Sequence, residues 1–179
     1  MQPAAYAADL GSLLSQTDWA VAEKMADIIE ERCSAGHTLF ACGNGGSAAT
    51  ASHFIEDVAK GLERRWRALA LTDNVPMITA LANDIGYEDV FAEQLANFVA
   101  EGDVLVAISG SGNSENVLRA VRLAKSRGAL TLGWTGFEGG KLKPRVDHCL
   151  VVPSDSMQRI EDVHLIVAHA IYAYLEAKA

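Results

Sequence analysis

Short, unbroken apolar runs alternate along the chain with longer segments whose apolar residues recur at helical spacing. Strands that are covered on both faces have unbroken apolar runs, whereas half-exposed strands alternate apolar and polar residues. The runs therefore predict five buried strands, at 38–42, 68–71, 104–108, 129–134 and 149–152. Segments of helical period separate them, at 48–60, 75–82, 89–100 and 115–127. This alternation predicts an α/β protein, with three α-β-α layers around a five-stranded parallel, flavodoxin-like sheet.

Both ends of the chain also have a helical pattern. Residues 4–35 are rich in alanine and predict one or two helices that end near Gly36. Residues 156–177 are apolar nearly all round, which is typical of a helix buried within a subunit or at an oligomer interface. The 179 residues suffice for one domain with a sizeable core. We expect a single domain over 1–179, with an N-terminal helical segment at 1–35 and an α/β core at 36–179.

Two glycine-rich loops follow predicted strands: residues 43–47 read GNGGS and residues 109–114 read SGSGNS. The second loop also precedes a helix, so free backbone N–H groups and the positive end of the helix dipole meet there. Its serines add hydrogen-bond donors, and its glycines let an anion approach the backbone. We interpret this loop as a phosphate site at the carboxyl edge of the sheet. The alternative is a flexible Gly/Ser turn, and the missing lysine excludes a Walker nucleotide loop.

Charge and cysteine content narrow the choice of partners. Half of the residues are hydrophobic, which argues against disorder. The net charge is −8, which argues against nucleic acid or an anionic membrane as partner. The three cysteines, Cys33, Cys42 and Cys149, are too scattered for a disulfide framework or a cysteine zinc site. Neither a signal peptide nor a membrane-spanning run is visible, so we expect a cytoplasmic protein.

Several motifs together resemble a known family. The loops at 43–47 and 109–114, and the segment 135–142 (TGFEGGKL), resemble the sugar isomerase (SIS) domain. Asn83-Asp84, and Arg159-Ile160 with the acidic and histidine residues after it, match further landmarks in the same order. Within that superfamily the chain is similar to the phosphoheptose isomerases. The resemblance implies isomerisation of sedoheptulose 7-phosphate to D-glycero-D-manno-heptose 7-phosphate through an enediol.

The resemblance also implies a set of residues that bind the substrate. They lie in the two glycine loops and at three positions outside them: Asn44, Gly45, Gly46, Ser47, Asn83, Asp84, Ser109, Gly110, Ser111, Ser114 and Gln158. The serines of the second loop would hold the phosphate, and the first loop would meet the sugar chain. Simpler roles remain open for three of these residues, because Asn44 suits a turn, Ser47 suits a helix cap and Asp84 suits a surface turn.

A zinc site on two helices is a further implication of the resemblance. His53 and Asp57 are four residues apart and share a helix face, while Glu161 and His169 are two turns apart on the last helix. Imidazoles and carboxylates suit Zn²⁺. Catalytic acid–base roles would fall to His169, Glu161 and Asp57. The alternative is that both histidines are structural residues of a core or an interface.

Three positions depart from the family pattern: Asp57, Glu161 and Gln158. The family pattern has Glu, Gln and Asp, respectively, at these positions. Asp57 is one methylene shorter than the usual residue, and Glu161 adds a charge. We therefore expect Glu161 to take over part of the proton transfer usually assigned to position 57.

Other functions stay open at this stage. They are isomerisation of another ketose phosphate, or a non-catalytic SIS protein that binds a sugar phosphate or the bacterial replication initiator. The retained His53, Asp57, Glu161 and His169 argue against loss of catalysis. The apolar last helix and the Ala-rich first segment predict a homotetramer, and the resemblance implies active sites between subunits.

Overall fold

A single parallel sheet forms the centre of the protein. The computed structural model describes residues 2–63 and 65–178, and in this part five strands pair in the order β2-β1-β3-β4-β5. The strands are β1 (Leu39–Cys42), β2 (Ala68–Ala70), β3 (Val104–Ile108), β4 (Leu130–Thr135) and β5 (His148–Val151). Every neighbouring pair is parallel. The fold class predicted from the apolar runs is therefore confirmed.

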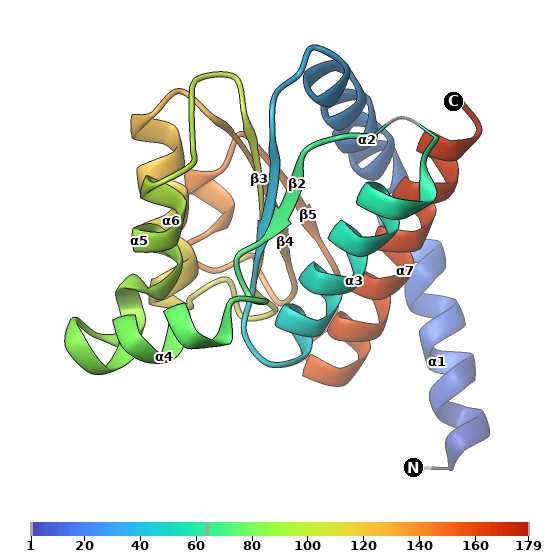
Figure 1. Ribbon diagram of the computed structural model, residues 1–179. Helices are drawn as coiled ribbons and strands as arrows, with labels where there is room; N and C mark the ends of the chain where they lie inside the picture. The colour runs from blue at the N-terminus through green and yellow to red at the C-terminus, as the bar shows by residue number, and fades with distance from the viewer. Residues whose placement is uncertain (1, 64, 179) are drawn as a thin grey trace.

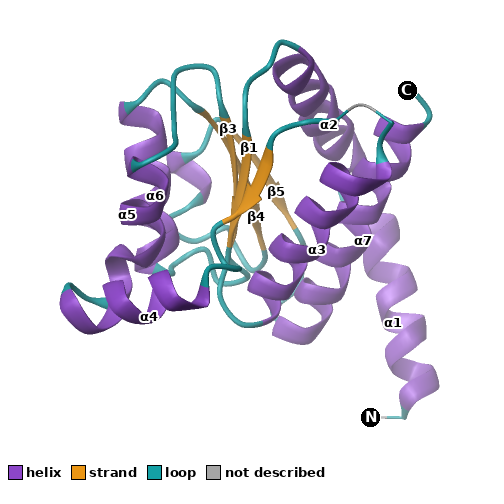
Figure 2. Cartoon of the chain, in the orientation of Figure 1, coloured by secondary structure: helices purple, strands orange, loops and turns teal. Residues whose placement is uncertain are grey.

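Helices cover both faces of the sheet (Figure 1). They are α1 (Pro3–Gln16), α2 (Trp19–Ser34), α3 (Gly46–Gly61), α4 (Val75–Asp84), α5 (Val90–Ala96), α6 (Glu115–Ser126) and α7 (Met157–Glu176). Two short 3₁₀ turns, η1 (Tyr87–Asp89) and η2 (Lys143–Arg145), complete the elements described. Figure 2 shows α4, α5 and α6 on one side of the strands and α2, α3 and α7 on the other, with α1 outside along α7.

Alternate residues of each strand enter two separate cores. Leu39 and Ala41 of β1 belong to the core under α2, α3 and α7. Phe40 and Cys42, one position along, belong to the core under α5 and α6. Both faces of the strand are thus buried in apolar surroundings, which explains why its sequence is apolar without a break.

The last helix packs against the core through one face, and its burial on the core is confirmed. Its apolar residues at Ile160, Val163, Val167 and Ile171 form one fully buried stripe, while the opposite side is partly exposed. Helix α5 is shorter than expected, because the chain leaves the helix after Ala96 and forms a turn before β3. In residues 2–63 and 65–178, no helix combines the length and apolarity needed to cross a bilayer.

The strand order creates a crevice where β1 lies beside β3. From β1 the chain proceeds to β2 on one side, and β3 pairs on the other side, so the connections diverge at this point. In doubly wound sheets, ligands bind at the carboxyl ends of the strands where this divergence occurs. The two glycine loops follow β1 and β3, so both border the crevice.

Candidate functional site

The loop at 109–114 is ordered by its own serines. Ser109 is buried, and its Oγ donates to the Oγ of Ser114 at 3.1 Å. The N–H of Gly112 donates to the carbonyl of Ser109 at 2.8 Å, which closes the turn. Ser114 precedes α6 without capping it through its side chain, whereas the N–H of Val117 in the first turn donates to Oδ1 of Asn116 at 3.0 Å. The N–H groups of Glu115 and Asn116, the first two of α6, remain available to an anion.

The segment 135–142 supports this loop through backbone hydrogen bonds. The N–H of Gly136 donates to Gly110 at 2.8 Å, and that of Leu142 donates to Gly112 at 2.9 Å. Gly112 has φ +65°, and a Cβ there would lie 2.2 Å from the carbonyl oxygen of Gly139. Only glycine fits this close approach. The third motif of the sequence thus supports the second one.

A cavity of about 220 Å³ opens in front of the loop. It is lined by Asn44, Ser47, Ile108, Ser109, Gly110, Ser111, Ser114, Met157 and Glu161. Seven of these nine residues are among those expected to act on the substrate. The carboxylate of Glu161 lies over Gly46, the first residue of α3, where a Cβ would be 2.5 Å from it. The carboxylate therefore lies at the N-terminal end of α3, where the helix dipole is positive.

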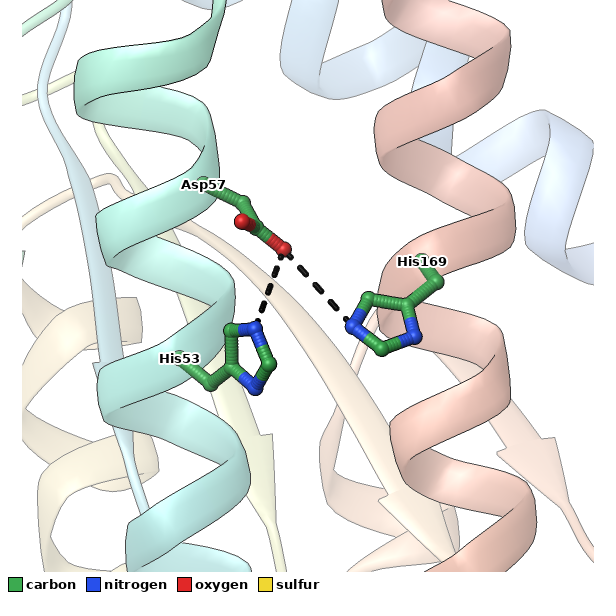
Figure 3. A group of neighbouring side chains, drawn as sticks. All are labelled: His53, Asp57 and His169. Atoms are coloured by element: carbon green, nitrogen blue, oxygen red, sulfur yellow. Dashed lines mark ion pairs between the residues drawn. The ribbon is translucent and has the colours of Figure 1, made fainter.

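His53, Asp57 and His169 converge from two helices. Figure 3 shows the side chains of His53 and Asp57 on α3 facing that of His169 on α7. The Oδ2 of Asp57 lies 3.6 Å from Nε2 of His53 and 3.9 Å from Nε2 of His169. The two imidazole side chains are about half exposed, so the group is open to solvent and to small ligands.

This group suits a divalent metal. One ligand atom from each of the three residues lies within 4.8 Å of the others. Tetrahedral zinc with bonds of about 2.0–2.1 Å places its ligand atoms roughly 3.4 Å apart, so small side-chain rotations would close the group. Two imidazoles and one carboxylate leave a fourth position open for a substrate or water.

The structure separates Glu161 from the three other expected ligands. Glu161 lines the loop cavity, whereas His169 lies eight residues further along α7, about 12 Å away along the helix axis. On α3, Ser47 of the cavity and His53 are likewise separated by about 9 Å. The phosphate loop and the His–Asp–His group therefore lie at successive levels of the α3–α7 pair, with Glu161 at the level of the loop.

Other expected residues lie apart from the cavity. Asn83 and Asp84 are exposed at the end of α4, and the side-chain nitrogen of Asn83 donates to Asp84 at 2.7 Å. Gln158 is exposed in the first turn of α7. Gly45, exposed in the first loop, is not among the lining residues either.

Two residues of the site were missed from the sequence. Met157 lines the cavity, and its sulfur occupies the space where a Cβ of Gly110 would be. Asn116 is buried in α6 and is hydrogen-bonded to Asn44. The polar Asn116 at the start of an otherwise apolar helix face was the available signal.

Burial makes two thiols and one histidine of the protein unsuitable for proton transfer. It raises the pKa of Cys33 and of Cys42 to about 12, so both thiols stay protonated at neutral pH. It lowers the pKa of His164 to about 4, although the Thr135 carbonyl partly opposes the shift. His164 is therefore a neutral core residue on α7.

Fold and site together define an SIS-domain protein, in which a serine–glycine loop follows a central strand of a parallel sheet. A family model described as the SIS domain matches residues 4–136. Phosphoheptose isomerase from Helicobacter pylori (strain Shi470) is 45% identical over 141 residues, covering 77% of this chain and 73% of that protein. The enzyme of that name from Aliarcobacter butzleri (strain RM4018) is 41% identical over 83% of this chain and 80% of its own length.

Solved structures agree with these relatives. Phosphoheptose isomerase from Neisseria gonorrhoeae superposes with a TM-score of 0.89 at 34% identity, covering 97% of this chain and 96% of that one. The Francisella tularensis enzyme gives 0.83 at 32% identity, covering 88% and 86%. The chain belongs to the phosphoheptose isomerase family of SIS-domain proteins, and it is a sugar-phosphate isomerase.

Proposed function

We propose that the protein interconverts sedoheptulose 7-phosphate and D-glycero-D-manno-heptose 7-phosphate. The observation that carries the proposal is the relation between two sites along α3 and α7. A cavity with an anion-binding loop contains a carboxylate, and a His–Asp–His group lies further along the same helices. The names of the relatives cited above support the choice of a heptose phosphate.

The reaction requires groups that move protons. An aldose–ketose exchange transfers one proton between adjacent carbons and another between their oxygens, through an enediolate. We assign the phosphate to the loop at 109–114, where N–H groups and hydroxyls converge. Glu161 is the candidate base at the sugar carbons, because it lines the cavity and is not engaged with His53 and His169.

Asp57 and His169 are the further candidate acid–base groups. The carboxylate of Asp57 lies between two imidazoles, which hold and orient it. His169 is half exposed, so it can exchange protons with a substrate oxygen or with solvent. In this assignment, proton transfer is shared with Glu161 and His169 and is not carried out by Asp57 alone.

We propose Zn²⁺ as the cofactor, held by His53, Asp57 and His169. When bound, it would act as a Lewis acid that polarises a sugar oxygen and stabilises negative charge on it. Glu161 would stay outside this ligand set in the arrangement described above, contrary to the four-residue set expected from the sequence.

A homotetramer with active sites between subunits is also part of the proposal. Large apolar side chains are exposed on α4 and just after it: Val75 at 61%, Met77 at 39% and Ile85 at 57%. Helix α4 has no buried residue at all. An apolar helix with this exposure fits an interface between copies.

We propose a cytoplasmic enzyme that uses neither nucleic acid nor membrane as partner.

The test combines metal analysis with isotope exchange. The purified protein is analysed for zinc and then incubated with sedoheptulose 7-phosphate in D₂O, with NMR detection of the sugar. The expected result is one zinc per chain, a new aldose signal and deuterium at the carbon adjacent to the carbonyl. If exchange occurs only with another ketose phosphate, that sugar phosphate is the substrate instead. Binding of sugar phosphate without any exchange would instead make the protein a non-catalytic sugar-phosphate binder.

A further inference from the structure

Asn44 of the first glycine loop is held by an unexpected partner. Its Nδ2 donates to Oδ1 of Asn116 at 2.8 Å, and Nδ2 of Asn116 donates back to Oδ1 of Asn44 at 2.8 Å. Asn116 is buried in the first turn of α6, only two residues after Ser114 of the phosphate loop. This reciprocal amide pair therefore joins the two glycine loops across the β1–β3 crevice.

The orientation of both amides follows from a backbone contact. The N–H of Val117 donates to Oδ1 of Asn116 at 3.0 Å, so that oxygen must face Val117 and Asn44 as an acceptor. The reciprocal pairing then fixes Oδ1 of Asn44 as the acceptor facing Asn116.

Tyr87 completes the network from a third direction. Its hydroxyl lies 2.9 Å from Oδ1 of Asn44 and donates to it, because a carbonyl oxygen can only accept. Oδ1 of Asn44 thus accepts two hydrogen bonds, and Nδ2 donates one. An amide nitrogen has two N–H groups, so one N–H of Asn44 has no partner among the described residues and is left for a ligand in the cavity that Asn44 lines.

We propose that Asn116 and Tyr87 are positioning residues that present this single N–H of Asn44 to a substrate oxygen. Asn44 would then recognise an acceptor, such as a sugar hydroxyl oxygen or a carbonyl oxygen, rather than a donor. Without the two partners, the amide can rotate and offer its oxygen as readily as its nitrogen. The inference rests on the proposed function, because it assumes that the sugar enters this cavity.

Tyr87 also fixes the arm of the protein, residues 75–89, which comprises α4 and η1. The arm carries Asn83 and Asp84, and α4 packs on the core under α5 and α6 through residues that are only partly buried: Ile78, Leu81 and Ala82. A second link lies at Asp89, which accepts from Arg119 of α6 at 2.6 Å. The Tyr87 contact is therefore a polar link between the arm and the first glycine loop, beside its effect on the orientation of Asn44.

Tyr87→Phe is the main test, because it removes one exposed hydroxyl and leaves the ring. Loss of a neutral hydrogen bond is expected to weaken binding of sedoheptulose 7-phosphate roughly 2- to 12-fold. Inorganic phosphate, which needs only the 109–114 loop, should bind with unchanged affinity. Asn116→Asp should act in the same direction, since it keeps the acceptor for Asn44 and Val117 but removes the donor. Tyr174→Phe is the matched control, because its hydroxyl contacts Asp27, away from the cavity.

Two further readouts separate positioning from a structural effect. In the Asn44→Ala background, Tyr87→Phe should have no additional effect on sugar-phosphate affinity, because both changes act through one amide. In NMR spectra of the ligand-free protein, the side-chain NH₂ signals of Asn44 should shift in Tyr87→Phe and stay in place in Tyr174→Phe.

The outcomes distinguish this inference from the proposed function. Unmoved Asn44 signals, or additive effects of the two substitutions on affinity, would overturn the positioning role. A wild-type protein that binds sedoheptulose 7-phosphate without converting it would overturn the proposed function alone, since the NMR shifts and the binding cycle need no turnover.

Discussion

Neutral His164 in the core makes the stability of the protein fall in mild acid. Its Nε2 lies 3.2 Å from the carbonyl oxygen of Thr135, so the ring proton sits on Nε2. Its Nδ1 has no hydrogen-bond partner among the described residues. A second proton on Nδ1 would therefore place an unpaired charge beside Trp134 in the core.

The size of the effect follows from the pKa of His164, which burial lowers from 6.5 to about 4. Between these values the unfolded chain binds a proton that the folded protein does not, so stability rises with pH. Conversely, stability falls as the pH drops from 6.5 towards 4. At 1.36 kcal/mol per pKa unit, the loss approaches roughly 3 kcal/mol in total and about 2 kcal/mol by pH 5.

Urea unfolding at fixed protein concentration, from pH 7.5 to 4.5, measures this loss. His164→Leu should remove about 2 kcal/mol of the difference between pH 7.5 and pH 5, whatever it does to stability at pH 7.5. His148→Gln, at a half-buried histidine on β5, is the control and should keep the wild-type pH dependence. If His164→Leu loses stability in acid as steeply as the wild type, the argument from burial is refuted.

The fold was largely predictable, because each strand is buried on both faces and its sequence records this directly. The run at 104–108 predicts β3 with its observed bounds. The helix ends were less predictable. Helix α3 begins at Gly46, two residues earlier than its apolar spacing suggests, because the glycine loop itself turns into the helix.

The site was predictable in its parts but not in its connections. Spacing of four residues predicts that His53 and Asp57 share a helix face, and the structure has both on one side of α3. No spacing rule gives the rotamer of Glu161, which lies over Gly46 because that glycine leaves room for its carboxylate. The Asn44–Asn116 pair joins residues 72 positions apart. Such a contact depends on β1 and β3 being neighbours, which local sequence does not specify.

Two further predictions concern assembly and the unusual carboxylates. Light scattering should give four times the 19.1 kDa mass of the chain, and a monomer would remove the proposed interface. Asp57→Asn should lower zinc content, because it removes a charged ligand, whereas Glu161→Gln should leave zinc bound and lower kcat by about 10²- to 10⁴-fold. The matching change in the cavity, Glu161→Asp, should restore part of kcat, since it retains the carboxylate at shorter reach. Full activity in Glu161→Gln together with no activity in Asp57→Asn would show that Asp57 alone moves the proton. Glu161, which lies apart from the metal group, would then have no catalytic role.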